Sequence, residues 1–291
     1  MDEALVLSRL LHFTATFLLL GSCAFLWQMA PPELSGRLEA QLRSLLRLAV
    51  IVTAVTAVAW LMLVAGSMGE GWEDTVRVAT LREVLLETRF GNVWLVRLGL
   101  IATLIATVAL GEGYRSRDVV VASGLVVASL RLVGHAAMDA GLPAVLRGIN
   151  HAVHLLSAGL WVGGLVPLAL VLGEGRAAKA DGVVATTLRR FSGMGHVAVA
   201  VVIATGAINT WLILGGWSIN IGSIYQRLLV AKILLVIAMI VLATINRYAF
   251  LPRLKRNSCA IQRLYRSTLI EIFLGLMVIG LVSYFATLEP V

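Results

Sequence analysis

Two histidines three residues apart stand at the head of an apolar stretch, INHAVHLLSAGLWVGGLVPLAL, at residues 149–170. A spacing of three places His151 and His154 on the same face of a helix. One imidazole in an apolar helix usually makes a structural hydrogen bond, whereas imidazoles that converge can bind a metal ion or a haem iron. His12 and His135 are the residues expected to join this pair.

Copper is the metal that the surrounding side chains favour. His135 is followed one turn later by Met138, in RLVGHAAMDA at residues 131–140. Soft thioether sulfur selects the cuprous ion, and imidazole nitrogen binds copper in either oxidation state. Asp139 is expected to orient a ligating imidazole from behind. We therefore predict a copper site with these ligands: His12, His135, His151, His154 and Met138.

Haem b is the alternative that the same residues allow. The iron of a b-type haem would need two imidazoles on opposite sides of the ring. His12, His135 and His154 are the candidates for that pair, and Arg131, one turn deeper than His135, would pair with a propionate. With haem the protein would be an oxidoreductase. With copper alone it would be a transporter, so enzyme activity stays open.

Other polar or aromatic residues inside apolar segments are candidates for supporting the site or lining an ion path. Trp161 follows His154 by seven residues on the same helix face, and Asn209 and Lys232 lie in later segments. Arg97 is a further charge inside an apolar segment and needs a partner. Such residues normally face the interior of a membrane bundle and mark function. Hydrogen bonding between helices is the structural alternative.

Membrane-spanning helices are the elements that would position these residues. Of the 291 residues, 59% are hydrophobic and only 14% are charged, little more than half the charged fraction of a typical soluble domain. Runs of about 20 apolar residues cross the hydrocarbon core as helices, which satisfy their own backbone hydrogen bonds. We predict an all-α polytopic membrane bundle of eight transmembrane helices, at residues 5–28, 45–66, 92–111, 119–138, 149–172, 194–215, 227–249 and 267–287.

Counts of Lys and Arg give the predicted orientation. The loops after the first, third, fifth and seventh spans hold, with their flanks, fifteen of these residues, and the opposite loops hold five. Because positive charge is retained on the cytoplasmic side, both termini are predicted to be periplasmic. This orientation puts His12, His135, His151 and His154 in the outer half of the membrane. The fifth histidine, His196, is predicted near the cytoplasmic surface.

The predicted organisation is a single integral-membrane domain, residues 1–291. Each group of four spans begins with a helix that carries histidine near its outer end, so residues 1–140 and 149–291 are candidates for a duplicated unit. Residues 67–91 are predicted as a periplasmic loop with an amphipathic helix at the lipid interface. Basic residues lie in short loops that would contact membrane lipids, so the net charge of +8 does not indicate nucleic-acid binding.

Several segments resemble a known family. They include HLLSAGLWVGGLVPLAL at 154–170, LRRFSGMGHVAVAVVIATGAINTW at 188–211 and INRYAFLPRL at 245–254. These are similar to the copper resistance protein D (CopD) family of bacterial inner-membrane proteins. The resemblance implies an eight-helix protein of copper uptake or tolerance that often works beside a periplasmic copper-binding partner. It also implies roles for His135, His151 or His154, Trp161, Asn209, Lys232, Asn246 and Glu271.

The leading hypothesis is copper transport across the bacterial inner (cytoplasmic) membrane through the periplasm-facing histidine site. Copper would lose its water to the imidazoles and pass inward between the first, fourth and fifth spans. The alternative is a redox protein similar to membrane b-type cytochromes, with haem held by paired histidines. The third hypothesis is an assembly protein that docks a periplasmic copper chaperone through loop 67–91 and holds no metal itself.

Overall fold

The computed structural model describes residues 1–111, 113–133, 141–177, 182–216, 222–253, 258–285 and 287–288. Within these ranges the secondary structure is helical, with no strand. The elements in chain order are α1 (Asp2–Ala24), the π-helix η1 (Phe25–Met29), α2 (Pro32–Met68), η2 (Trp72–Thr75), α3 (Val78–Glu87), α4 (Arg89–Leu110), α5 (Arg117–Ala128), η3 (Ser129–Leu132), α6 (Leu142–Ala177), α7 (Gly182–Leu214), α8 (Ile224–Ile245), the π-helix η5 (Asn246–Phe250), η6 (Leu251–Arg253) and α9 (Ser258–Phe285).

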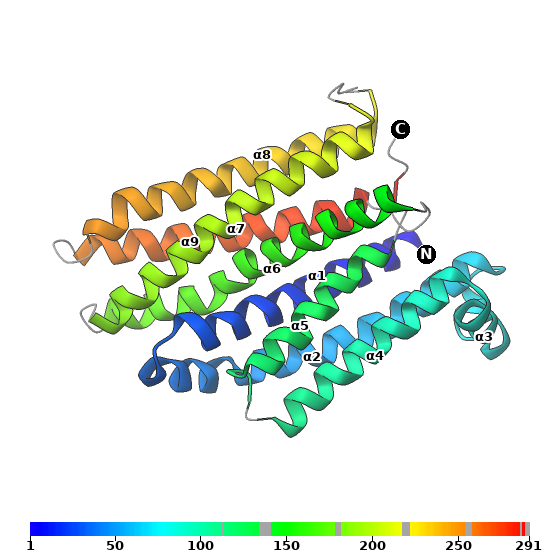
Figure 1. The fold of residues 1–291 in the computed structure, drawn as a ribbon, viewed down its shortest axis with the longest axis horizontal. Helices are drawn as coiled ribbons and strands as arrows, with labels where there is room; N and C mark the ends of the chain where they lie inside the picture. Colours follow the sequence, from blue (N-terminus) through cyan, green and yellow to red (C-terminus); the bar gives the residue numbers. More distant parts are fainter. Residues whose placement is uncertain are drawn as a thin grey trace.

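Seven helices of the described chain are long and apolar enough to cross a membrane. They are α1 with η1, α2, α4, α6, α7, α8 with η5 and η6, and α9, and they coincide with seven of the eight predicted spans. Figure 1 shows these helices running lengthwise through one bundle. The prediction of an all-α, polytopic membrane fold is confirmed.

The remaining predicted span, 119–138, is described as far as Val133. It begins as α5, where the hydroxyl of Ser116 caps the helix by accepting a hydrogen bond from the N–H of Val119 at 3.2 Å, and it continues as η3. In Figure 1, α1 begins and α9 ends at the same end of the bundle, which requires an even number of crossings. The count of eight spans and the periplasmic termini stay predictions, and this arrangement supports an even count.

Helices α1 and α6 lie at the centre of the bundle and approach each other at glycines. Gly21 and Gly163 are so close that a Cβ atom on either would collide with the backbone of the other helix. The hydroxyl of Ser22 donates to the carbonyl of Gly163 at 3.3 Å. Phe17, four residues before Gly21, packs against Gly159, four residues before Gly163, so the two helices run parallel. This contact fixes the depth of each side chain on α1 relative to α6.

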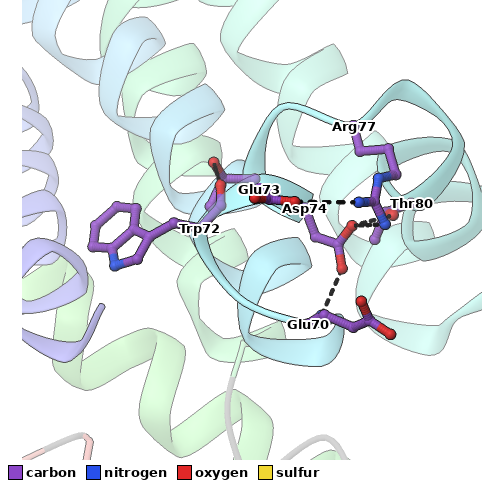
Figure 2. Close-up of polar contacts among 7 residues, drawn as sticks. Glu70, Trp72, Glu73, Asp74, Arg77 and Thr80 are labelled. Carbon is purple, nitrogen blue, oxygen red and sulfur yellow. Dashed lines mark hydrogen bonds and ion pairs between the residues drawn. The ribbon is translucent and has the colours of Figure 1, made fainter.

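The segment between α2 and α4 is held together by Asp74 (Figure 2). Its carboxylate accepts hydrogen bonds from the backbone N–H of Glu70 at 2.5 Å and from the hydroxyl of Thr80 at 3.1 Å. It also pairs with Arg77 at 2.6 Å. These bonds tie η2 to α3, which is the helix predicted within this loop. Trp72 points away from the cluster and is 60% exposed. The placement of α3 at the lipid interface stays a prediction.

Candidate functional site

His154 of α6 is hydrogen-bonded to Thr205 of α7. Its Nδ1 lies 2.9 Å from Oγ1 of Thr205, and that hydroxyl donates its single hydrogen to the carbonyl of Val201 at 2.5 Å. The Thr205 oxygen can therefore only accept, so Nδ1 of His154 carries the ring hydrogen and donates it. Nε2 keeps a lone pair that receives no hydrogen bond from any described side chain. An imidazole with one nitrogen fixed and the other available is what a metal ligand requires.

A second imidazole, that of His151, and the cation of Lys232 lie near His154. His151 lies one turn nearer the start of α6 and interacts electrostatically with His154. The ammonium of Lys232, on α8, acts on both imidazoles. It also lies 5.9 Å from the ring centre of Phe285. The structure therefore gathers His151, His154 and Lys232, which the sequence places on two different spans.

Two asparagines fasten α6 to α7 beside these histidines. The side-chain amide of Asn150 donates to Oδ1 of Asn209 at 2.9 Å and to the carbonyl of Thr205 at 3.0 Å. Gly206 leaves room for the imidazole, because a Cβ atom there would lie 3.3 Å from Cε1 of His154. Asn209 thus supports the site by holding the helix that carries Thr205. The supporting role of Asn209 at a metal site stays a prediction.

His12 of α1 forms a separate network with α2 and α4. Its Nδ1 lies 2.9 Å from Oγ1 of Thr56, which donates to the carbonyl of Val52 at 2.6 Å, so Nδ1 again carries the ring hydrogen. Its Nε2 lies 2.7 Å from Nη2 of Arg97, a group that can only donate. Arg97 also donates to the hydroxyl of Ser129 at 2.8 Å. Both nitrogens of His12 are therefore occupied.

Aromatic rings surround the cations of this network. The guanidinium of Arg97, which is fully buried, lies 5.2 Å from the ring centre of Trp94. Arg9 lies 5.0 Å from the ring centre of Trp60, which meets His12 edge-on with ring centres 5.9 Å apart. Among the described residues no carboxylate forms an ion pair with either arginine. A cation–π contact and hydrogen bonds to neutral groups therefore compensate the buried charge of Arg97. Arg9 has the contact with Trp60, and its Nε and Nη1 have no hydrogen-bond partner among the described residues.

His12 and His154 lie at the same depth on opposite sides of the α1–α6 contact. Each stands nine residues before the glycine of that contact, Gly21 for His12 and Gly163 for His154, on helices that run parallel. Nine residues make two and a half turns, so each histidine points away from the contact. His12 points to α2 and α4, and His154 points to α7. In each case the imidazole donates to a threonine of the next long helix.

The predicted copper ligands are thus brought together only in part. His151 and His154 share one site, and His12 lies in the other network. His135, Met138 and Asp139 lie outside the described residues. Within the part of the chain that the structure describes, no group of three His, Cys, Asp or Glu side chains could hold a metal ion. The full ligand set stays a prediction.

Comparisons with known proteins cover nearly the whole chain. Residues 1–145 match the family "Copper resistance protein D-like, N-terminal domain", and residues 185–285 match the family "Copper resistance protein D". "Inner membrane protein YebZ" of Escherichia coli K12 is 31% identical over 289 residues, which make up 97% of each chain. The chain belongs to the copper resistance protein D family.

Two further CopD-family relatives carry copper in their names. "Copper resistance protein D" of Pseudomonas syringae pv. tomato is 26% identical, over 99% of this chain and 97% of that protein. "Copper transport protein CutJ" of Bacillus subtilis is 28% identical over 229 residues, which are 76% of this chain and 40% of that protein. No solved structure matches the chain.

Trp161 lies further along α6 than the two imidazoles of this CopD-family chain, and Arg131 lies near the start of that helix. Trp161 follows His154 by seven residues, a rise of about 10 Å along α6, and lines a cavity further along that helix. The guanidinium of Arg131, at the end of η3, packs over Gly148 near the start of α6. The predicted role of Trp161 in an ion path stays a prediction, and Arg131 lies at the end of the bundle where α6 begins.

Some residues of the site carry little signal in the sequence. Thr205 and Asn209 are four residues apart in ATGAINTW, a spacing that puts both on one face of α7. That spacing could have linked Thr205 to the site. Asn150 and Thr56 have no comparable pattern, because asparagine and threonine are ordinary in membrane helices. Arg97 was identifiable as a buried charge, but its partner His12 was not.

Proposed function

We propose that this protein carries copper across the bacterial inner membrane and that His151 and His154 form its entry site. The names of two relatives, copper resistance protein D and copper transport protein CutJ, support copper as the cargo. The inner-membrane relative and the long apolar helices support a multi-pass inner-membrane protein. The entry site lies at the end of the bundle that the distribution of Lys and Arg predicts to be periplasmic.

The hydrogen bonding of the two ring nitrogens of His154 is the observation that supports this proposal most directly. Thr205 holds Nδ1, so the Nε2 lone pair has a fixed direction and meets no described hydrogen-bond donor. His151 supplies a second imidazole from the same face of α6. Two imidazoles suit copper in either oxidation state. His135 and Met138 are proposed as the remaining ligands.

The contrast with His12 supports a copper site in the second half alone. Arg97 occupies Nε2 of His12, and a guanidinium keeps its charge under all ordinary conditions. The cation that acts on His154 is Lys232, which has no hydrogen bond to the imidazole among the described contacts. An ammonium on a flexible stem can lose a proton or move aside. We infer that residues 1–140 and 149–291 are copies of one unit, in which the first copy became structural.

The proposed path runs on the α7 side of α6. Helices α1 and α6 are in backbone contact at Gly21 and Gly163, which leaves no space for an ion between the first and fifth spans at this depth. On the other side, one face of α6 carries His151, His154 and then Trp161 at the wall of a cavity. The ion would pass inward along this face, between α6, α7 and α8.

Haem b is the second candidate, because Lys232 favours an anionic group beside the imidazoles. A haem propionate would form a charge-assisted hydrogen bond with this ammonium. His154 fits an axial ligand, since its Nε2 is available. His12 does not fit in this structure, because both of its nitrogens are hydrogen-bonded. A Soret band of the purified protein that shifts on reduction would favour haem over copper transport.

A periplasmic copper-binding protein is the proposed donor of the ion. The segment that joins α2 to α4 offers a surface for it at the same end of the bundle as the histidine site, with Trp72 exposed beside the ordered Asp74 cluster (Figure 2). Copurification of such a partner with a metal-free chain would instead favour the assembly hypothesis.

Copper uptake into proteoliposomes tests the transport proposal. The wild type should take up Cu(I) with saturation, and His151→Ala and His154→Ala should each lower the initial rate at least about tenfold, the lower limit for losing a metal ligand or its support. Val153→Ala is the matched control, because Val153 lies on the same turn of α6 and is 38% exposed. Equal uptake by all four proteins would refute the proposed entry site.

A further inference from the structure

A cavity of about 290 Å³ lies in the half of the bundle away from the histidine site. Helix α7 packs against α6, α8 packs against α9, and the cavity lies between these two pairs. Its walls are mainly aliphatic, with Trp161 and Phe191 as the aromatic residues. Ile203 of α7 and Thr244 of α8 line the cavity and are also exposed on the outside of the bundle. The cavity therefore opens sideways, toward the lipid.

The polar wall of this cavity is rich in hydrogen-bond acceptors. Glu271 of α9 is 2% exposed, and its Oε1 accepts a hydrogen bond from the amide of Asn246 at 2.6 Å. Among the described residues no cationic side chain forms an ion pair with Glu271. The side-chain carbonyl of Asn246 is buried and accepts no hydrogen bond. This one buried carbonyl oxygen without a partner is costly and calls for a donor.

The nearest cation, Arg247, also lines the cavity and is bonded to α7 through one of its nitrogens. Arg247 follows Asn246 in the π-helix η5, and its Nη1 donates to the carbonyl and the hydroxyl of Ser192, both at 2.9 Å. The same nitrogen lies 3.1 Å from Nδ1 of His196. These bonds join η5 to α7 at the end of the cavity. The π-helical turn thus points Asn246 toward Glu271 and Arg247 toward α7, and such turns are frequent at functional sites.

The chemistry of the walls selects the kind of ligand. A metal ion would fill a small part of the volume, and the described residues hold no group of three metal-ligating side chains. An anionic lipid headgroup would meet the carboxyl of Glu271. A plain acyl chain would leave the acceptors of Glu271 and Asn246 unfilled. The ligand that remains is a neutral, lipid-soluble ring with hydroxyl donors.

We propose that this cavity binds a lipid-soluble quinol. One ring hydroxyl donates to Glu271, the ring lies among the aliphatic walls beside Trp161 and Phe191, and the tail leaves between α7 and α8. The volume suits a single substituted ring, since ligand pockets begin near 300 Å³. The proposal concerns binding and uses neither His151 nor His154, although the cavity adjoins the proposed copper path at Trp161.

Binding of decylubiquinol to the full chain in lipid nanodiscs, kept reduced under argon, tests the proposal by calorimetry. Ala200 is exposed and lines the cavity, whereas Val197 is 66% exposed on the same helix and does not line it. Ala200→Trp should block the opening and Val197→Trp should not. Glu271→Gln should weaken binding about tenfold, because an amide reproduces the hydrogen bonding of the carboxyl group only in part. Glu174→Gln is its control, because Glu174 bonds to Gln41 outside the cavity.

Three results together would support the assignment. The wild type should bind the quinol with saturation. Ala200→Trp should lose binding while Val197→Trp keeps it, and Glu271→Gln should bind more weakly while Glu174→Gln binds as the wild type does. Absence of saturable binding would overturn it, as would equal binding by the two tryptophan variants. His154→Ala should bind the quinol with unchanged affinity. Failure of the copper proposal would therefore leave this result intact.

Discussion

Nε2 of His12 lies 2.7 Å from Nη2 of Arg97, whereas Nε2 of His154 receives no hydrogen bond from a described side chain. In both sites Nδ1 of the imidazole lies 2.9 Å from a threonine hydroxyl of the following long helix. The charge of Lys232, on α8, acts on His154 without such a contact. We propose that this difference, Arg97 in one half and Lys232 in the other, leaves only His154 with an Nε2 able to bind a metal ion.

Lys232→Arg should convert the second site into a copy of the first. A guanidinium cannot lose its proton and forms several directed hydrogen bonds, so it would occupy Nε2 of His154 as Arg97 occupies Nε2 of His12. We expect the affinity for Cu(I) to fall at least about tenfold, as for loss of a supporting contact. Lys232→Met, which removes the charge, should retain binding. Competition with a colorimetric Cu(I) chelator measures both, and equal affinity of Lys232→Arg and the wild type would contradict the account.

Thr205→Val should weaken copper binding, and Thr56→Val should not. Thr205 fixes the orientation and the protonated nitrogen of His154, and removal of such a partner lowers metal affinity about 10- to 100-fold. Thr56 plays the same part for His12, which is held by Arg97 and is not expected to bind copper. The same chelator competition compares the two variants. A loss of affinity in Thr56→Val equal to that in Thr205→Val would show that both halves bind the metal.

Gly163→Ala should destabilise the bundle at its centre. A Cβ atom there would collide with the backbone carbonyl of Phe17, which cannot move aside as a side chain could, so we expect a loss of about 1–3 kcal/mol. Gly193→Ala is the control, because a Cβ atom at Gly193 of α7 has no neighbour within 4 Å. At this position alanine should stabilise the helix by about 0.5–1 kcal/mol relative to glycine. Thermal unfolding in one detergent compares the variants, and equal midpoints would contradict the close contact.

Acid should loosen the loop between α2 and α4 through Asp74. The hydrogen bond from the N–H of Glu70, the hydroxyl of Thr80 and the charge of Arg77 hold the pKa of this carboxyl below its usual value. Because the folded pKa is the lower one, the stabilisation is complete above the unfolded value of about 3.9 and is lost as pH falls through the folded value. Hydrogen exchange at Glu70, corrected for intrinsic rates, should accelerate only in this acidic range.

Asp74→Asn provides the matching comparison for the pH dependence. The amide cannot pair with Arg77 and accepts more weakly, so exchange at Glu70 should already be fast at neutral pH and should change little with acid. A wild-type loop that stays protected throughout the acidic range would contradict a structural role for the Asp74 carboxylate.

The long helices were predictable from sequence because the membrane leaves the backbone few alternatives. Apolar runs predicted seven of the spanning helices, although α2 and α7 begin 13 and 12 residues before the predicted spans. The amphipathic helix predicted within residues 67–91 is α3. The period of 3.6 residues also placed His151 and His154 correctly on one face of α6. These inferences depend only on the order of residues within a single helix.

The partners across helices were not predictable in the same way. His12 and Arg97 are 85 residues apart, and no local pattern links them. Helical period gives the direction of a side chain relative to its own helix, whereas the glycine contact of Gly21 with Gly163 decides which neighbour that direction meets. Because this contact turns His12 and His154 away from each other, histidines at equal depth did not imply one shared pocket.

X-ray absorption spectroscopy of the copper-loaded protein is the most direct test of the entry site. The account predicts imidazole scattering around copper in the wild type and in Val153→Ala, and its loss in the double variant His151→Ala, His154→Ala. The same imidazole signal in the double variant would contradict the account, because copper would then be bound by other histidines.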